Sequence, residues 1–286
     1  MEQKITLEEI QNFKGNYPKQ LWYLFFVEMW ERFCFYGMRG VLVIFMVDQL
    51  FLKEDHASEQ YGAIQAFVYA FTFIGGIFAD KVLGFKKSLF FGGIVMILGN
   101  LLIAVAPHDM FYYGIAFSII GTGFFKPNVS SMVGELYHEN DGRRDAGYGM
   151  FYAGINVGGL FGGALCVYLG KYYSWQLCFL SAAIVMFLGL VTFLFTKKNL
   201  GPIGDSPLLN LAPAKRRIRE IAVYALSILS LPFIFIMVKN TDYTDYFMYT
   251  IGTIAVAYFV YELFKLGGKF DQTTFVFYRF LRTGRI

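Results

Sequence analysis

Three ionisable side chains, Glu28, Glu31 and Arg32, lie inside an otherwise apolar stretch that runs from Leu21 to about Leu50. In a helix, residues three or four positions apart share a face, so these side chains form one charged stripe. Burial disfavours the ionised form of a carboxyl group, whereas a neighbouring guanidinium favours it. Two carboxylates beside one arginine can therefore bind and release a proton. The alternative is a structural ion pair between packed helices.

The elements that hold this stripe are predicted to be membrane helices. Hydrophobic residues make up 56% of the 286-residue chain and charged residues only 16%, against roughly a quarter charged in soluble domains. A spanning helix needs about 20 mainly apolar residues. The sequence therefore predicts an all-α membrane protein with eight spans: Leu21–Leu50, Tyr61–Ala79, Ser88–Ala106, Phe111–Tyr137, Gly147–Leu169, Trp175–Phe195, Ile221–Val238 and Tyr246–Leu266.

The positive charges indicate the orientation of these spans. Most of the 25 Lys and Arg residues fall in alternate connecting segments, whereas the opposite side holds only Lys53, Lys171 and Lys239. Positive residues concentrate on the cytoplasmic side of spanning helices. We therefore expect a multi-pass protein of the cell (cytoplasmic, inner) membrane with a cytoplasmic N-terminus. The net charge of +4 is explained by this pattern, so we expect the lipid bilayer and not a nucleic acid as a partner.

Loop lengths predict how the chain is organised. The longest loop contains Gly201, Pro202 and Pro207, which is typical of a linker. Overlapping G-x-x-x-G spacings between Gly154 and Gly163 predict close helix packing. We expect a cytoplasmic N-terminal segment (1–20), a six-helix bundle (21–195), a cytoplasmic linker (196–219), an accessory transmembrane helix pair (220–266) and an unassigned tail (267–286).

Further polar residues are predicted at membrane depth. Lys126 stands in mid-span before Pro127, which removes a backbone donor and tends to kink a helix. Asn156 offers both a donor and an acceptor to a ligand. Tyr36 and Tyr69 could supply hydroxyl groups and aromatic walls, although for Tyr69 simple packing is a strong alternative because the chain has 20 tyrosines.

Signs of enzymatic chemistry are not found in the sequence. The G-x-S-x-G, H-E-x-x-H and phosphate-loop motifs do not occur. The three cysteines, Cys34, Cys166 and Cys178, lie in apolar spans without the C-x-x-C spacing of a zinc site. We therefore expect no catalytic residues, no metal and no cofactor.

Four segments, in order along the chain, resemble signatures of the proton-dependent oligopeptide transporter family within the major facilitator superfamily. They are Glu28–Gly37 (EMWERFCFYG), Gly75–Asp80 (GGIFAD), Gly121–Asn128 (GTGFFKPN) and Phe151–Gly158 (FYAGINVG). The sequence departs from the family pattern at Phe35, where a tyrosine is usual. It is also shorter than family members, which carry a second six-helix bundle.

The resemblance implies a fold, an activity and roles for particular residues. The fold would be the N-terminal six-helix bundle of the superfamily, followed by two accessory helices. The activity would be symport of di- and tripeptides with protons by alternating access. When the site is empty, Lys126 would pair with Glu28 or Glu31. The implied roles are proton coupling by Glu28, Glu31 and Arg32; substrate binding by Arg32, Tyr36, Tyr69, Lys126 and Asn156; and a conformational latch formed by Asp80, Lys86 and Lys87.

Two other functions stay open at this point. The chain could be a non-transporting truncated fragment or scaffold, because the cavity of the family lies between two bundles and one is encoded here. It could also carry a different small solute, such as nitrate or an organic acid. The expected partners are small peptides and protons, together with a missing or separate C-terminal six-helix half.

Overall fold

The computed structural model describes residues 5–266, with side chains described as far as residue 261, and this part of the chain is nearly all helical. It forms two compact units, Met1–Lys239 and Asn240–Ile286, which are described separately. The first unit contains α1 (Leu7–Gln11), α2 (Lys19–Leu50), α3 (Glu54–Phe78), a π-helical turn (Ala79–Leu83), α4 (Phe85–Val105), α5 (Phe111–Glu135), α6 (Arg144–Tyr172), α7 (Trp175–Thr196), a 3-10 turn (Lys197–Leu200), α8 (Pro213–Leu229) and α9 (Leu231–Lys239). The described part of the second unit is α10 (Thr241–Leu266), and the predicted tail 267–286 lies outside the described residues.

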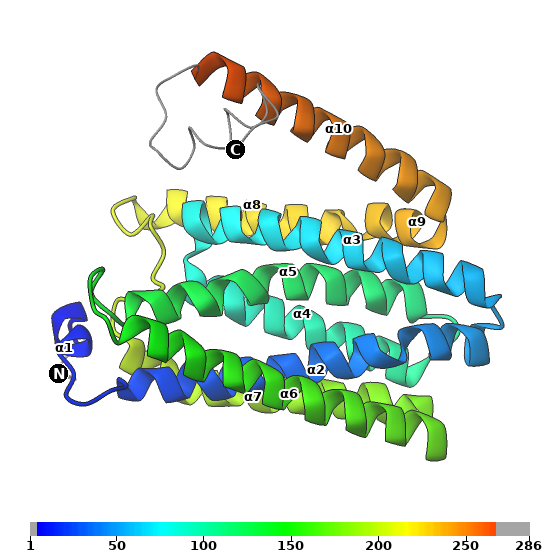
Figure 1. The fold of residues 1–286 in the computed structure, drawn as a ribbon, viewed down its shortest axis with the longest axis horizontal. Helices are drawn as coiled ribbons and strands as arrows, with labels where there is room; N and C mark the ends of the chain where they lie inside the picture. The colour runs from blue at the N-terminus through cyan, green and yellow to red at the C-terminus, as the bar shows by residue number, and fades with distance from the viewer. Residues whose placement is uncertain (1–4, 267–286) are drawn as a thin grey trace, which may run out of the picture. The chain divides into compact units, whose positions relative to one another are not determined.

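Six helical segments of the described chain are long and apolar enough to cross a membrane, compared with the eight spans predicted. They are Lys19–Leu50, Glu54–Leu83, Phe85–Val105, Arg144–Tyr172, Trp175–Leu200 and Pro213–Lys239. The helices α5 and α10 are long enough but are not among these six. In α5, Lys126 and a run of Gly, Ser and Asn residues reduce the hydropathy. Nevertheless, α5 packs against α3 and α4 and runs alongside them (Figure 1).

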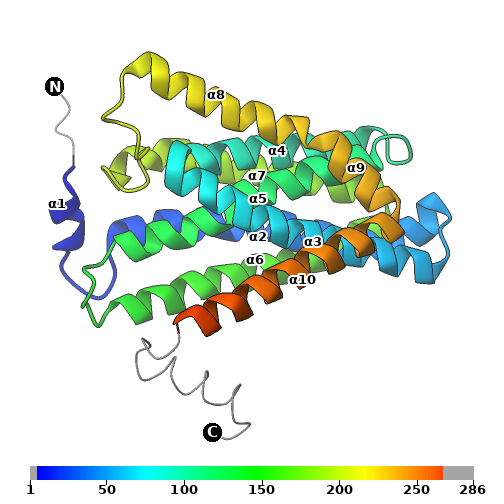
Figure 2. The ribbon, with the colours of Figure 1, turned by 90° about the horizontal axis from the view of Figure 1, so that it is seen from above.

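The first unit is a helix bundle in which α2 and α5 are central. Helix α2 packs against α6 and α7, α4 packs against α5 and α7, and α3 packs against α5 (Figures 1 and 2). Aromatic rings fill one end of the core. The ring of Phe45 on α2 lies 5.2 Å from the rings of both Phe111 on α5 and Phe179 on α7, measured between centroids.

Glycines allow the helices to approach each other closely, as the sequence predicts. A Cβ atom at Gly158 or Gly162 of α6 would collide with a backbone carbonyl oxygen of α2, that of Met29 or Phe33 respectively. Small residues permit such contacts in membrane bundles, where backbone packing replaces the hydrophobic drive. The glycine face of α6 therefore fixes its position against the charged stripe of α2.

The linker after α7 folds back onto the turn between α3 and α4. Gly84 has a positive φ of 76°, and a Cβ atom there would lie 2.5 Å from the carbonyl carbon of Asp205. Ser206 Oγ donates a hydrogen bond of 2.6 Å to the Val82 carbonyl. Only glycine combines this backbone conformation with so close an approach. The linker is thus packed against the bundle.

The predicted seventh span is divided into two helices. Helix α8 begins at Pro213, where a proline is favourable because the first N–H groups of a helix have no intrahelical partner. It ends at Leu229, and α9 begins at Leu231, immediately before Pro232. Proline cannot donate the hydrogen bond that would continue the first helix. The break therefore follows directly from the sequence.

Candidate functional site

The carboxylate stripe of α2 is buried inside the bundle. Glu28 and Arg32 are each 2% exposed and Glu31 is 0% exposed. Arg32 Nε lies 3.1 Å from Glu28 Oε1. The same Nε donates a hydrogen bond to Glu31 Oε2, which Nη2 also approaches. One guanidinium therefore serves two carboxyl groups.

Hydrogen bonding within this cluster is incomplete. Glu28 Oε2 and Glu31 Oε1 are buried, and neither has a hydrogen-bond partner among the described residues. Leaving a buried polar atom unpaired costs about 1–3 kcal/mol, and more for a charged group. The cluster holds two carboxyl groups and one cation, so one added proton would make it neutral. Its geometry is suited to binding a proton.

Aromatic rings surround the Arg32 guanidinium. Its central carbon lies 5.1 Å from the ring centroid of Phe35 and 5.9 Å from that of Tyr36. Phe35 is buried, 3% exposed, so the hydroxyl that a tyrosine would carry there would point into the packed bundle. Tyr36 is partly exposed, and a Cβ atom at Gly159 of α6 would come within 3.1 Å of its ring.

One further cation, Lys126, stands against an aromatic ring of a neighbouring helix. Lys126 of α5 is half-buried, and its ammonium lies 5.1 Å from the ring centroid of Tyr69 on α3. Its field acts on both Glu28 and Glu31. However, no ion pair joins Lys126 to either glutamate within the described part of the chain. The structure therefore does not show the expected pairing, and the ammonium contacts the tyrosine ring.

The structure thus brings Glu28, Glu31, Arg32 and Tyr36 together on α2. Lys126 and Tyr69 form a neighbouring pair on α5 and α3. Asn156 of α6 is exposed and lies one turn before Gly159, the residue that faces Tyr36.

The two lysines of the predicted latch pair with residues other than Asp80. Lys86 Nζ donates hydrogen bonds to the Gly201 carbonyl at 2.5 Å and to Asp205 Oδ1 at 2.8 Å. Lys87 Nζ donates to Glu220 Oε1 of α8 at 2.6 Å. Asp80 is exposed in the π-helical turn, and no hydrogen bond or ion pair to it is found in the described region. The two lysines therefore hold the linker and α8 against the start of α4.

Sequence reasoning missed two contacts of this region. Arg39 Nε donates a hydrogen bond of 2.7 Å to the hydroxyl of Tyr61 on α3. Asn100 Nδ2 of α4 lies 3.5 Å from Cys34 Sγ, next to the buried carboxylates. Each contact joins residues of two different helices, which the spacing within one helix cannot reveal. The contact of Phe35 with Arg32 lies within one helix, and the three-residue spacing of these side chains places them on the same face.

The fold and the buried ionic cluster are those of a multi-pass helical membrane transporter, and comparisons with known proteins show its family. A family model described as the POT family matches residues 86–212. An uncharacterized transporter of Bacillus subtilis (strain 168), YclF, is 41% identical over 198 residues, which are 67% of this chain and 40% of that protein. Dipeptide and tripeptide permease A of Cronobacter turicensis is 34% identical over 192 residues, which are 66% of this chain and 38% of the permease.

Solved structures agree with these matches. The crystal structure of a peptide transporter POT in complex with sulfate superposes with a TM-score of 0.73 at 33% identity, covering 94% of this chain and 57% of that one. This chain belongs to the POT family of membrane transporters, within the major facilitator superfamily. It spans less than half the length of the two curated relatives described above.

Proposed function

We propose that this chain supplies the N-terminal bundle of a carrier that moves di- and tripeptides together with protons. The observation that carries the proposal is the buried cluster of Glu28, Glu31 and Arg32. In this cluster two carboxyl groups share one guanidinium, and each has one oxygen without a hydrogen-bond partner among the described residues. Ionisable groups at membrane depth usually mark ion or substrate paths. The N-terminus would lie in the cytoplasm and the protein in the cytoplasmic membrane.

Glu28 is the proposed proton carrier. Arg32 Nε donates to Glu31, and Nη2 approaches the same oxygen, whereas the contact to Glu28 is a single approach of 3.1 Å. A proton on Glu28 would leave the Glu31–Arg32 pair intact and neutral. Loss of that proton would return one uncompensated negative charge to the cluster.

Peptide binding is proposed for the residues around this cluster. Arg32 and Lys126 are the cations that would hold the terminal carboxylate of a peptide, and Asn156 would bond its backbone. Tyr36 and Tyr69, which contact these cations, would form the aromatic walls. A separate C-terminal half would complete the site, and proton and peptide together would favour rocking of one bundle against the other.

The start of α4 is proposed as the conformational latch. Lys86 and Lys87, with Asp80 nearby in sequence, would hold one state of the carrier through the linker and α8. A bias of a few kcal/mol is sufficient to shift a two-state equilibrium almost completely.

Peptide uptake into proteoliposomes under an imposed inward proton gradient tests the proposed function. We expect gradient-driven accumulation of labelled dialanine when the chain is reconstituted with a second six-helix bundle of the family. Glu28→Gln should abolish the effect of the gradient but retain peptide exchange, whereas Asp48→Asn, on the same helix but exposed, should change neither. Uptake of nitrate or an organic acid in place of peptide would show that the carrier has a different substrate. Absence of any uptake would favour a non-transporting scaffold.

A further inference from the structure

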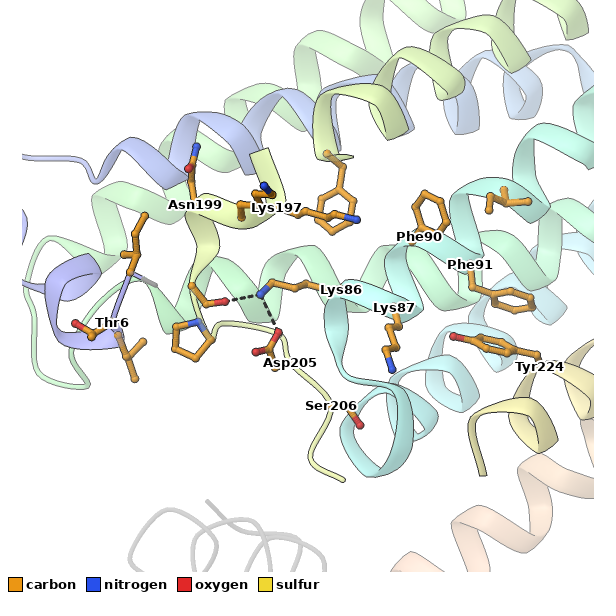
Figure 3. A pocket seen from close by; sticks show the side chains of 18 residues that line it. Thr6, Lys86, Lys87, Phe90, Phe91, Lys197, Asn199, Asp205, Ser206 and Tyr224 are labelled. Atoms are coloured by element: carbon orange, nitrogen blue, oxygen red, sulfur yellow. Dashed lines mark hydrogen bonds and ion pairs between the residues drawn. The ribbon is translucent and has the colours of Figure 1, made fainter. Parts of the chain in front are cut away.

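A cavity of about 1250 Å³ lies at the linker end of the bundle, well apart in sequence from the buried carboxylates. It is bounded by the start of α4, the end of α7, the linker and α8 (Figure 3). Ligand sites are commonly about 300–1,000 Å³, so the cavity has room for a sizeable molecule. Its lining includes four lysines and one carboxylate, that of Asp205, and Lys87 is also paired with Glu220 of α8. Positive charge remains in excess, so the cavity favours an anion.

The lining changes from charged to aromatic along the helices. Lys86 and Lys87 stand at the start of α4, and Phe90 and Phe91 follow one turn later. The end of α7 shows this order in reverse, because Phe193 of α7 comes one turn before Lys197, the first residue of the 3-10 turn. Figure 3 shows Lys86, Lys197 and Asn199 at one end, and Phe91 and Tyr224 at the other. A turn advances about 5 Å, so both helices place cations at one level and rings deeper.

At the aromatic end, α4 and α8 contact each other through their rings. The ring centroids of Phe91 on α4 and Tyr224 on α8 are 4.8 Å apart. At the charged end, Lys86 is held by the Gly201 carbonyl and Asp205, so it builds the wall. Lys197 is exposed, and no hydrogen bond or ion pair joins its ammonium to a described residue. Its ammonium is therefore available to a ligand.

We propose that this cavity binds an anionic phospholipid. The phosphate would lie at the level of Lys197, and an acyl chain would lie against Phe90, Phe91 and Ile94. Basic pockets between transmembrane helices on the cytoplasmic side have the chemistry to bind acidic head groups. The adjoining aromatic rings distinguish a lipid from a free phosphate, which has no apolar part. The site is separate from the Glu28 cluster and does not depend on the proposed transport.

Lipid binding to the purified chain in detergent tests the proposal, with phosphatidylglycerol as the probe. Native mass spectrometry and thermal unfolding should both show binding of phosphatidylglycerol in preference to phosphatidylcholine of the same chains. Each unit of charge near a lipid surface contributes about fivefold to binding. Lys197→Gln removes one unit and should weaken that binding about fivefold, whereas Lys197→Glu changes two units and should weaken it about twentyfold or more. Lys53→Glu, an exposed lysine outside the cavity, should have no effect.

Two outcomes would overturn the proposal. Equal binding of phosphatidylglycerol to the wild type and Lys197→Glu would show that the lysine does not hold the head group. If inorganic phosphate raised the unfolding temperature as much as phosphatidylglycerol does, the site would be assigned to a free anion. Unfolding temperatures measured without added lipid serve as the control, because a variant that is merely destabilised would show its shift there.

Discussion

At the scale of single residues, Arg32 determines the character of the candidate site. It lies between two carboxyl groups, 3.1 Å from Glu28 and hydrogen-bonded to Glu31, with aromatic rings beside it. Taking an ion pair out of water is costly, and removing one partner leaves an uncompensated buried charge. The three side chains should therefore differ in how much each contributes to stability.

Arg32→Leu should lower the free energy of unfolding by about 3–5 kcal/mol, the usual cost of breaking a buried pair. Glu28→Gln should cost much less, because the Glu31–Arg32 pair stays neutral and hydrogen-bonded. Unfolding of the purified chain in detergent measures both. Arg39→Leu is the matched control on the same helix, since Arg39 is partly exposed and its side chain forms one hydrogen bond within the described residues, to Tyr61. A larger loss for Glu28→Gln than for Arg32→Leu would contradict this ranking.

At the scale of elements, close packing of α6 on α2 fixes the position of the charged stripe. Gly158→Ala would press a methyl group against the Met29 carbonyl oxygen and the Arg32 side chain. Overpacking of this kind typically costs about 1–3 kcal/mol, so we expect a destabilised chain in thermal unfolding. Gly163→Ala, on the same helix with no heavy atom within 4 Å of the new Cβ, should be neutral or slightly stabilising, because alanine favours helix. Equal effects of the two substitutions would argue against close α2–α6 packing.

A second element, the N-terminal segment, is held by the loop between α5 and α6. Arg143 Nη1 donates to the Gly15 carbonyl at 2.8 Å, and its guanidinium lies 4.0 Å from the ring centroid of Phe13. The Asp141 carboxylate fixes the same guanidinium, because it accepts hydrogen bonds from Arg143 Nε and Nη2. These hydrogen bonds lower the pKa of Asp141 from 3.8 to about 2.

The contribution of Asp141 to this contact should depend on pH. Because the pKa is lower in the folded state, the stabilisation is fully present above about pH 4 and is lost as the pH falls through about 2. Hydrogen exchange of the amides of α1, corrected for the intrinsic rate, should show loosening over that range. Asp141→Asn should loosen α1 already at neutral pH and show less change on acidification. The same acid response in both proteins would exclude Asp141 as the cause.

At the scale of the whole molecule, the sequence was informative about helices and less so about contacts between them. The apolar stretches and the G-x-x-x-G spacings of α6 predicted helices and close packing, because both depend on periodicity within one segment. The predicted seventh span ran through the break between α8 and α9, although Pro232 explains that break. The partner of Lys126 was not predicted. Lys126 contacts Tyr69 of another helix, and such a contact depends on how the helices are oriented in three dimensions.

The central claim, that the buried carboxyl cluster takes up a proton, can be tested on this chain without a second bundle. Infrared difference spectra of the reconstituted protein, recorded from about pH 5 to about pH 9, report the C=O stretch of a protonated carboxyl group. We predict a pH-dependent band that disappears in Glu28→Gln and persists in Asp48→Asn. An unchanged band in Glu28→Gln, or no titrating band in the wild type, would contradict the assignment of Glu28 as the proton carrier.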